Sequence, residues 1–445
     1  MIIKRKNLLI SILFSTISLL TISNVTRWKE DAFWGCDAGG YYSYLPAIFI
    51  YHDLTTMDAY GQIEALHFPS YKKYGYYQNP TTKKWVNKYP VGMALMDLPF
   101  YLTAHFLSLN IPEATYDGYS EIFRLLIVLG TIFYTSCGLW FLSRLLNKYF
   151  STKAVLITLA AIAFGTNLFT YNTYLAGLSP HPLLFFFISA LLFYIDGWIK
   201  NPNFKYSFII GLLVGLCVIT RVTAGLIVVI PLFLFLRQII KGKLNRPMLH
   251  ISLSTLGFMS IAIIQMFYWH ETTGHWIYYS YVEEGFDFLH PHIIDGLFSY
   301  RKGWFVYTPI ALIGLIGLKQ VYKSLTLKQY FYPFLIYFAT VIYVVFSWRA
   351  WFYGGGFGAR AMIDSYGVLA IPLCALIDSI FRLHKKGLST ILMTVLICFV
   401  SLNIFQSIQF ERGVIPWDGT TKKYYWAIFG DIKGSEEKAK LLNEE

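Results

Sequence analysis

Long apolar runs dominate this sequence. Stretches of about 20 residues with few or no charges recur from one end of the chain to the other, for example 121 to 143 and 388 to 408. A helix of this length spans the hydrocarbon core of a bilayer. The apolarity is continuous and does not alternate every second residue, which is the pattern of a membrane helix and not of a membrane strand. The sequence therefore predicts an all-α, polytopic bundle of membrane-spanning helices.

The runs predict about eleven crossings, and the composition agrees with so many. Only 14% of the residues are charged, whereas a soluble domain usually carries about 25%, so this chain could not cover itself with polar surface. The predicted crossings are roughly 7 to 25, 121 to 143, 154 to 172, 181 to 199, 206 to 221, 222 to 240, 249 to 269, 304 to 322, 330 to 348, 361 to 381 and 388 to 408.

The Lys and Arg residues predict the orientation of the bundle. Six connections on one side hold 18 of the 37 Lys and Arg residues and no Asp or Glu. Because short cytoplasmic loops are enriched in Lys and Arg, we expect the amino terminus in the cytoplasm and the carboxyl terminus on the outer face of the cytoplasmic (inner) cell membrane. The six connections are 1 to 6, 144 to 153, 200 to 205, 237 to 246, 319 to 328 and 382 to 386. The net charge of +12 is thus explained by topology, and nucleic acid is not expected as a partner.

The predicted membrane domain covers residues 1 to 408 and includes a very long outer connection, residues 26 to 120. This connection contains a second apolar segment, 90 to 109, which lacks a basic flank. We expect that segment to form a helix lying in, or dipping into, the outer membrane interface. Residues 409 to 445 are expected to form a tail on the outer face.

One carboxylate of the long outer connection has unusual surroundings. Asp37 lies in the segment GCDAGGYYSYLP, residues 35 to 46. The small residues let a bulky group approach it, and the tyrosines are typical of a membrane–water boundary. We interpret Asp37 as the general base of an enzyme at that boundary, a role that typically contributes ~10² to 10⁴ in rate. The alternative for Asp37 is that it caps the helix beginning near Tyr41. Asp31 is the competing carboxylate, although a solvated loop charge accounts for that residue better.

Basic residues at the outer edges of the predicted bilayer are candidates for binding an anion. Lys88 precedes the second apolar segment, Arg301 and Lys302 precede the crossing at 304, and Arg360 follows the glycine-rich stretch 354 to 358. Glycines allow close backbone approach and tryptophans stack on sugar faces, so this set suits an anionic lipid or a diphosphate. The alternatives are a snorkelling Lys88 and an ordinary aromatic belt with basic flanks.

Two further polar residues lie at helix ends. The crossings at 206 and 222 share 35 residues, fewer than the roughly 40 that two full spans need. The turn at Arg221 should therefore lie below the outer surface, where a charge faces a wet cavity or an anionic partner. An ion pair with an embedded acid such as Asp364 is the alternative. His181 opens the crossing at 181 and is a candidate for hydrogen bonding a substrate, with a polar helix cap as its alternative.

Acidic residues and histidines also gather in one outer loop. They could hold a divalent metal, but their spacing matches no compact ligand pattern, so no metal ligand is predicted and a metal requirement stays open. The residues are Glu271, His275, Glu283, Glu284, Asp287, His290 and His292. The sequence contains no nucleotide-binding glycine loop, no serine nucleophile elbow and no His-Glu-x-x-His zinc motif.

The arrangement resembles the membrane-embedded C-type glycosyltransferase superfamily, which includes protein O-mannosyltransferases and lipid A aminoarabinose transferases. The resemblance rests on a first crossing followed by an outer loop with Asp37, and on Lys88 opening an interfacial helix. It extends to the segments 41 to 47, 88 to 92, 165 to 169 and 211 to 223. Tyr89 stands where the aminoarabinose branch tends to have the first proline of Lys-Pro-Pro, and the Asp-x-Asp pattern of the metal-using branch is absent.

The resemblance implies transfer of a sugar from a polyprenyl-phosphate donor to a hydroxyl of a glycan, lipid or protein acceptor at the outer face. Asp37 would take the proton of the attacking hydroxyl. The departing phosphate would be held by Lys88, Arg360 and, with them, Arg221 and Arg301. A single displacement would invert the anomeric centre. The sugar, the acceptor and the oligomeric state are not specified by the sequence.

Two other kinds of protein compete with this interpretation. A transporter or flippase of lipid-linked sugars would also need embedded charges, but it predicts symmetric halves with broken helices, and no such repeat is found in the sequence. A surface polysaccharide polymerase or ligase would carry its largest outer loop late in the chain, whereas here the largest comes first.

Overall fold

The computed structural model describes residues 2 to 30, 34 to 67, 75 to 109, 117 to 383 and 386 to 443. Nearly all of the regular structure in these ranges is helical, and one small antiparallel sheet pairs β1 (Tyr76–Gln78) with β2 (Trp85–Asn87). The predicted all-α fold is confirmed. Asp31 lies outside the described residues.

Seven helices in the described ranges are long and apolar enough to cross a membrane. Their length matches the roughly 20 residues that a bilayer requires, and their apolar surface indicates a membrane protein. They are α7 (Glu121–Leu146), α10 (His181–Lys200), η3 with α12 (Val222–Ile240), α13 (Pro247–Thr273), η4 with α18 (Lys328–Phe346), η5 with α19 (Arg360–Arg382) and α20 (Lys386–Glu411).

The predicted count of about eleven crossings is therefore not supported. Three of the other four runs form apolar helices that are only 13 to 17 residues long: Leu8–Ser23 within α1 (Ile2–Ser23), α8 (Thr152–Phe164) and α11 (Phe204–Thr220). The run at 304 to 322 is broken into α15 (Trp304–Tyr307), α16 (Ile310–Ile316) and α17 (Leu318–Lys323). Between α16 and α17, Gly317 packs closely on α19, since a Cβ there would lie 2.0 Å from the carbonyl oxygen of Pro372. Continuous hydropathy along the chain does not reveal such interruptions.

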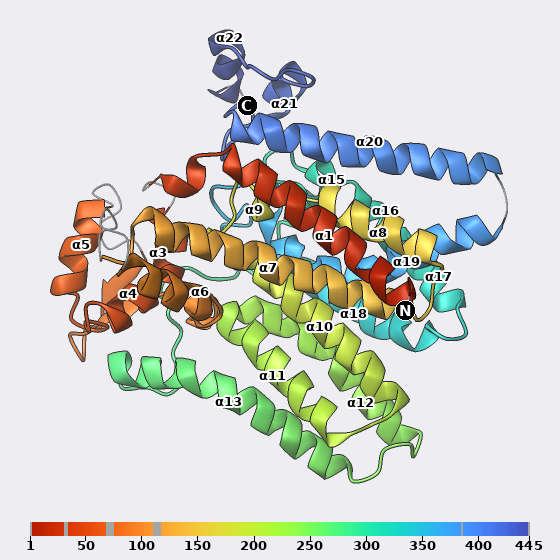
Figure 1. The fold of residues 1–445 in the computed structure, drawn as a ribbon, viewed down its shortest axis with the longest axis horizontal. Helices are drawn as coiled ribbons and strands as arrows, with labels where there is room; N and C mark the ends of the chain where they lie inside the picture. The colour runs from red at the N-terminus through yellow and green to blue at the C-terminus, as the bar shows by residue number, and fades with distance from the viewer. Residues whose placement is uncertain (1, 31–33, 68–74, 110–116, 384–385, 444–445) are drawn as a thin grey trace.

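The long helices run roughly along the longest axis of the molecule (Figure 1). At one end lie the short helices of the long connection, α3 (Asp37–Tyr42), α4 (Tyr44–Phe49) and α5 (Ala59–His67), whereas the amino terminus of α1 lies at the other end. The second apolar segment forms α6 (Gly92–Ser108), which packs on α7 and contacts α3 and α4.

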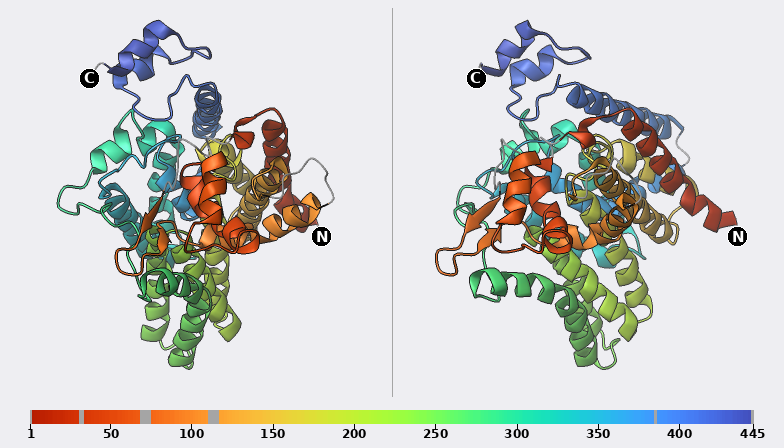
Figure 2. Two further views of the ribbon diagram at one scale, coloured as in Figure 1. Left: turned by 90° about the vertical axis from the view of Figure 1, so that its left-hand side faces the viewer. Right: turned by 60° about the vertical axis from the view of Figure 1, so that its left-hand side comes forward.

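The carboxyl-terminal segment folds back onto the bundle. After α20 it forms α21 (Lys422–Ala427), α22 (Glu436–Ala439) and η6 (Lys440–Asn443), which stand on the side of the molecule opposite α13 (Figure 2). Arg27 joins the beginning of the chain to the end of α20 through an ion pair of 3.0 Å with Glu411. The residues between α20 and α21 include the buried Val414 and Ile415, so the predicted tail is a packed part of the fold.

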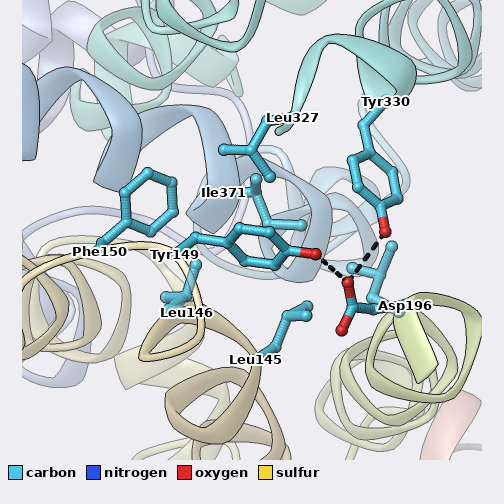
Figure 3. Close-up of a pocket in the computed structure, with 9 residues that line it drawn as sticks. Leu145, Leu146, Tyr149, Phe150, Asp196, Leu327, Tyr330 and Ile371 are labelled. Carbon is cyan, nitrogen blue, oxygen red and sulfur yellow. Dashed lines mark hydrogen bonds between the residues drawn. The ribbon is translucent and has the colours of Figure 1, made fainter. Parts of the chain in front are cut away.

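A buried carboxylate near the carboxyl end of α10 links several helices through hydrogen bonds. Asp196 accepts hydrogen bonds from Tyr149, from Tyr330 at 3.1 Å and from the ammonium groups of Lys148 at 2.7 Å and Lys200 at 3.2 Å. Figure 3 shows both phenol hydroxyls converging on this carboxylate. The adjacent cavity of about 10 Å³ is the size of one water molecule, so the cluster is a structural anchor.

Candidate functional site

A cavity of about 1040 Å³ opens at the end of the bundle that carries α3. Its wall combines α3, the connection from β2 to α6, the segment leading into α10, the turn after α11, the loop after α13, the glycine-rich loop before η5 and the segment after α20. Many of the lining side chains are aromatic, among them Tyr41, Trp269, Tyr281, Trp348 and Trp417. A cavity of this size and lining is large enough for a small polar molecule with part of an apolar chain.

The structure brings five of the predicted site residues to this one cavity. Asp37, Lys88, His181, Arg221 and Arg360 all line it, although they come from five separate parts of the chain. Such convergence of titratable side chains on a large aromatic cavity marks the default position for a functional site.

Asp37 is the first residue of α3, and the glycines after it determine what lies beside it. A Cβ on Gly40 would be 2.1 Å from the Tyr89 ring, so only glycine leaves room for that ring. The Tyr89 hydroxyl donates a hydrogen bond of 2.5 Å to Asp37 Oδ1. The predicted bulky neighbour of Asp37 is thus, in this structure, a side chain of the protein itself.

The second carboxylate oxygen of Asp37 is held by Arg360. The guanidinium Nη2 lies 2.8 Å from Asp37 Oδ2, and the two side chains are only 20% and 29% exposed. Burial by itself raises the pKa of the Asp37 carboxyl, but Arg360, the Tyr89 hydroxyl and Lys88 together lower that pKa below its ordinary value. Asp37 is therefore ionised at neutral pH, with both oxygens engaged.

Lys88 reaches the same wall from the connection between β2 and α6. Its ammonium group forms an ion pair of 2.8 Å with Glu284, which belongs to the loop after α13. It also lies 5.1 Å from the centre of the Tyr89 ring and 5.9 Å from that of Tyr281. Because the Glu284 side chain is 48% exposed, this carboxylate is a replaceable partner for the lysine.

A second cluster of charged and titratable side chains surrounds Asp364. This buried carboxylate of η5 lies 2.7 Å from Nδ1 of His181 and 3.5 Å from Nη1 of Arg221. The Arg221 guanidinium also lies 4.8 Å from the centre of the Tyr353 ring. The ion pair expected as the alternative for Arg221 is therefore present, yet Arg221 still lines the cavity.

The other two predicted phosphate ligands, Arg301 and Lys302, are not among the residues that line the cavity. Arg301 binds Asp418 with its Nε and Nη2 at 2.9 and 2.8 Å. Lys302 is 3% exposed and donates to the backbone oxygens of Gly356 and, at 2.6 Å, Trp417. Burial lowers the pKa of Lys302 to about 7. In this structure neither cation lines the cavity, and Lys302 joins the glycine-rich loop to the segment after α20.

Three residues near the site were not among the predicted site residues. Tyr89 binds the candidate base, Asp364 orients His181, and Glu284 neutralises Lys88. The sequence offered Asp364 only as a partner for Arg221 and Glu284 only as a member of the acidic outer loop, and it assigned no contact to Tyr89. In the described part of the chain, no group of three or more His, Cys, Asp or Glu side chains could hold a metal ion.

Comparison with protein-family models and with curated proteins finds no match for this chain. The function is therefore argued from the residues of the cavity and from the resemblance carried by the sequence motifs.

Proposed function

We propose that this chain is an integral membrane glycosyltransferase that moves a sugar from a polyprenyl-phosphate donor to a hydroxyl acceptor. The observation that carries the proposal is the pairing of Asp37 with Arg360 on the wall of a large aromatic cavity. Lys88 and Arg221 line the same wall. A lipid-linked donor needs a carboxylate for the acceptor proton, cations for the phosphate, and access from the bilayer, and it needs no nucleotide site.

Each of the three cations forms an ion pair with a carboxylate. Arg360 pairs with Asp37, Arg221 with Asp364, and Lys88 with Glu284. An entering phosphodiester competes for these cations, and transfer of Arg360 from Asp37 to the phosphate frees one carboxylate oxygen. Removing the positive partner also makes Asp37 a stronger base at the moment when a base is required.

The reaction is then a single displacement. The acceptor hydroxyl gives its proton to Asp37 while its oxygen attacks the anomeric carbon, and the bond from that carbon to the phosphate oxygen breaks. The bonding electrons leave on the phosphate, where cations stabilise them. Attack opposite the leaving group inverts the anomeric centre.

The orientation and the full number of crossings belong to this proposal. The three shorter apolar helices and the broken segment α15–α17 complete eleven crossings if the protein spans a cell membrane with its amino terminus in the cytoplasm. The Lys and Arg distribution supports this topology, which places the cavity and the carboxyl terminus on the outer face.

The test is sugar transfer by the purified protein in proteoliposomes, with a panel of polyprenyl-phosphate sugars. Asp37→Asn should abolish transfer without changing the thermal unfolding midpoint by more than a few degrees. Asp431→Asn is the matched control, because that carboxylate pairs with Lys438 away from the cavity and should leave transfer intact. Full transfer by Asp37→Asn would remove Asp37 as the base, and failure of every donor with the wild type would refute the proposed reaction.

A further inference from the structure

A second proton-carrying group faces the cavity from the start of α10. His181 lies in the segment Ser179-Pro180-His181-Pro182, so its ring is fixed at the point where the helix begins. Its Nδ1 lies 2.7 Å from Oδ1 of Asp364, and the residue is only 3% exposed although it lines the cavity. A histidine held in this way has one defined orientation.

The contact with Asp364 also determines where the ring carries its proton. A carboxylate only accepts, so Nδ1 is the donor, and Nε2 of the neutral ring is left with a lone pair. In the described part of the chain, Nε2 forms no hydrogen bond. This pairing of a buried carboxylate, an oriented imidazole and a free second nitrogen is the arrangement by which proteins build a proton donor or acceptor.

The charges around the ring indicate the ligand. The groups that face His181 are the carboxylate of Asp364 and the guanidinium groups of Arg221 and Arg360, with the Tyr171 ring edge-on at 6.2 Å between ring centres. Two cations and one anion leave a net positive environment that attracts an anion. In free solution the second ionisation of a phosphate monoester and the ionisation of imidazole both fall near pH 6 to 7, so a proton exchanges between these two kinds of group at little cost in free energy.

We propose that His181 is the proton donor to the departing phosphate and that Asp364 is its positioning residue. The inference rests on the proposed function and adds a general acid to it. Nε2 first takes up a proton from water, which makes the ring an imidazolium. As the bond between the anomeric carbon and the phosphate oxygen then breaks, the bonding pair goes to that oxygen and the Nε2 proton follows. The products are the glycosylated acceptor, protonated Asp37, neutral His181 and a polyprenyl phosphate monoanion. Asp37 then loses its proton and His181 regains one from water.

Binding of the product provides a test that needs no turnover. At about pH 8 both free polyprenyl phosphate and free imidazole are largely unprotonated. Calorimetric titration of the full chain in nanodiscs with polyprenyl phosphate, in buffers of different ionisation enthalpy, should give uptake of about one proton per phosphate bound. His181→Gln should bind the phosphate with most of that uptake lost. Asp37→Asn should retain the proton uptake, which would exclude the Asp37 carboxylate as the proton acceptor.

Turnover provides the second test. His181→Gln should lower kcat by roughly 10²- to 10⁴-fold with little change in KM, and the loss of rate at basic pH should disappear from its pH profile. Asp364→Asn should lower kcat less and move that basic limb, because the ring keeps its nitrogen but loses its anionic partner. A wild-type unfolding midpoint for both variants shows that the fold is intact.

The outcomes separate the two proposals. Phosphate binding without proton uptake by the wild type, or uptake and kcat unchanged in His181→Gln, overturns the role of His181 and leaves the transferase proposal standing. Uptake that depends on His181, in a protein that transfers no sugar from any donor, supports the proton donor and overturns the transferase.

Discussion

Replacing Arg360 should weaken the use of the donor and change the pH dependence of transfer. In Arg360→Gln, Asp37 loses a partner whose Nη2 lies 2.8 Å from its Oδ2. Unit charges about 4 Å apart attract by roughly 4 kcal/mol at an effective dielectric constant of ~20. Both side chains are partly exposed, at 20% and 29%, so solvent screening reduces the contribution of the pair to about 1 to 2 kcal/mol.

The direction in which the pKa of Asp37 changes determines how transfer depends on pH. In the wild type, burial raises the pKa of Asp37, but Arg360 first, then Tyr89 and Lys88, lower it below its ordinary value of 3.8. Asp37 stays ionised down to that range, so wild-type transfer should show no acid limb due to this residue from about pH 5 to 8. Without Arg360, burial is less opposed and the pKa of Asp37 rises, so the acid limb of the variant should lie at a higher pH than that of the wild type and appear at the acid end of this range, near pH 5.

The assay is kcat/KM for a polyprenyl-phosphate sugar in proteoliposomes across this pH range. Loss of one charged hydrogen bond to the phosphate costs about 1.5 to 3 kcal/mol, which corresponds to roughly 10- to 100-fold in kcat/KM at neutral pH. Lys148→Gln is the matched control, since it breaks an ion pair of 2.7 Å with Asp196 at the far end of α10 and should not alter transfer. An Arg360→Gln enzyme with wild-type kcat/KM and no new acid limb would refute the reasoning.

Three further substitutions probe the cavity wall. Burial lowers the pKa of Lys302 from 10.5 to about 7, so between these pH values the folded chain binds fewer protons than the unfolded chain and stability should rise with pH. In Lys302→Met the unfolding midpoint should change less with pH across this window. An unchanged slope would contradict the lowered pKa of Lys302. Glu284→Gln removes the carboxylate that pairs with Lys88 and should lower the donor KM by up to about fivefold, since an exposed pair contributes at most ~1 kcal/mol. An unchanged KM would show that this pair does not compete with the donor. Gly40→Ala places a methyl group 2.1 Å from the Tyr89 ring, so the ring must move away from the candidate base. We expect a lower kcat and a loss of about 1 to 3 kcal/mol in the free energy of unfolding. A normal kcat would exclude a role for the Tyr89 ring in transfer.

Much of the fold could be predicted from apolar runs, because lipid-facing and buried helices share one simple requirement of length and hydropathy. What hydropathy missed are local interruptions with causes distant in sequence. The run at 304 to 322 reads as one span, but Gly317 packs against the backbone of Pro372, and that contact exists only in three dimensions. The number of full-length spans was therefore overestimated, whereas the helical class was not.

The candidate site shows the same division. Asp37, Lys88, Arg221 and Arg360 were identified from unusual charge next to glycines or helix ends, and the structure brings them to one cavity with His181. Arg301 and Lys302 carry the same sequence signature but are bound elsewhere. Their partners, Asp418 and the backbone of residues 356 and 417, lie far along the chain, and nothing in a single sequence links them.

The segment after α20 has a consequence for how the protein is made. Residues 410 to 417 supply part of the cavity wall, and Glu411 is clasped by Arg27 from the beginning of the chain. A ribosome delivers these residues after all the other parts of the wall, at about 5 to 20 residues per second. The cavity wall therefore stays incomplete until this segment has been made and docks against parts of the chain that were made earlier. A nascent chain arrested before that moment would hold every charged side chain discussed above except those of the final segment, yet lack a finished compartment in which to use them.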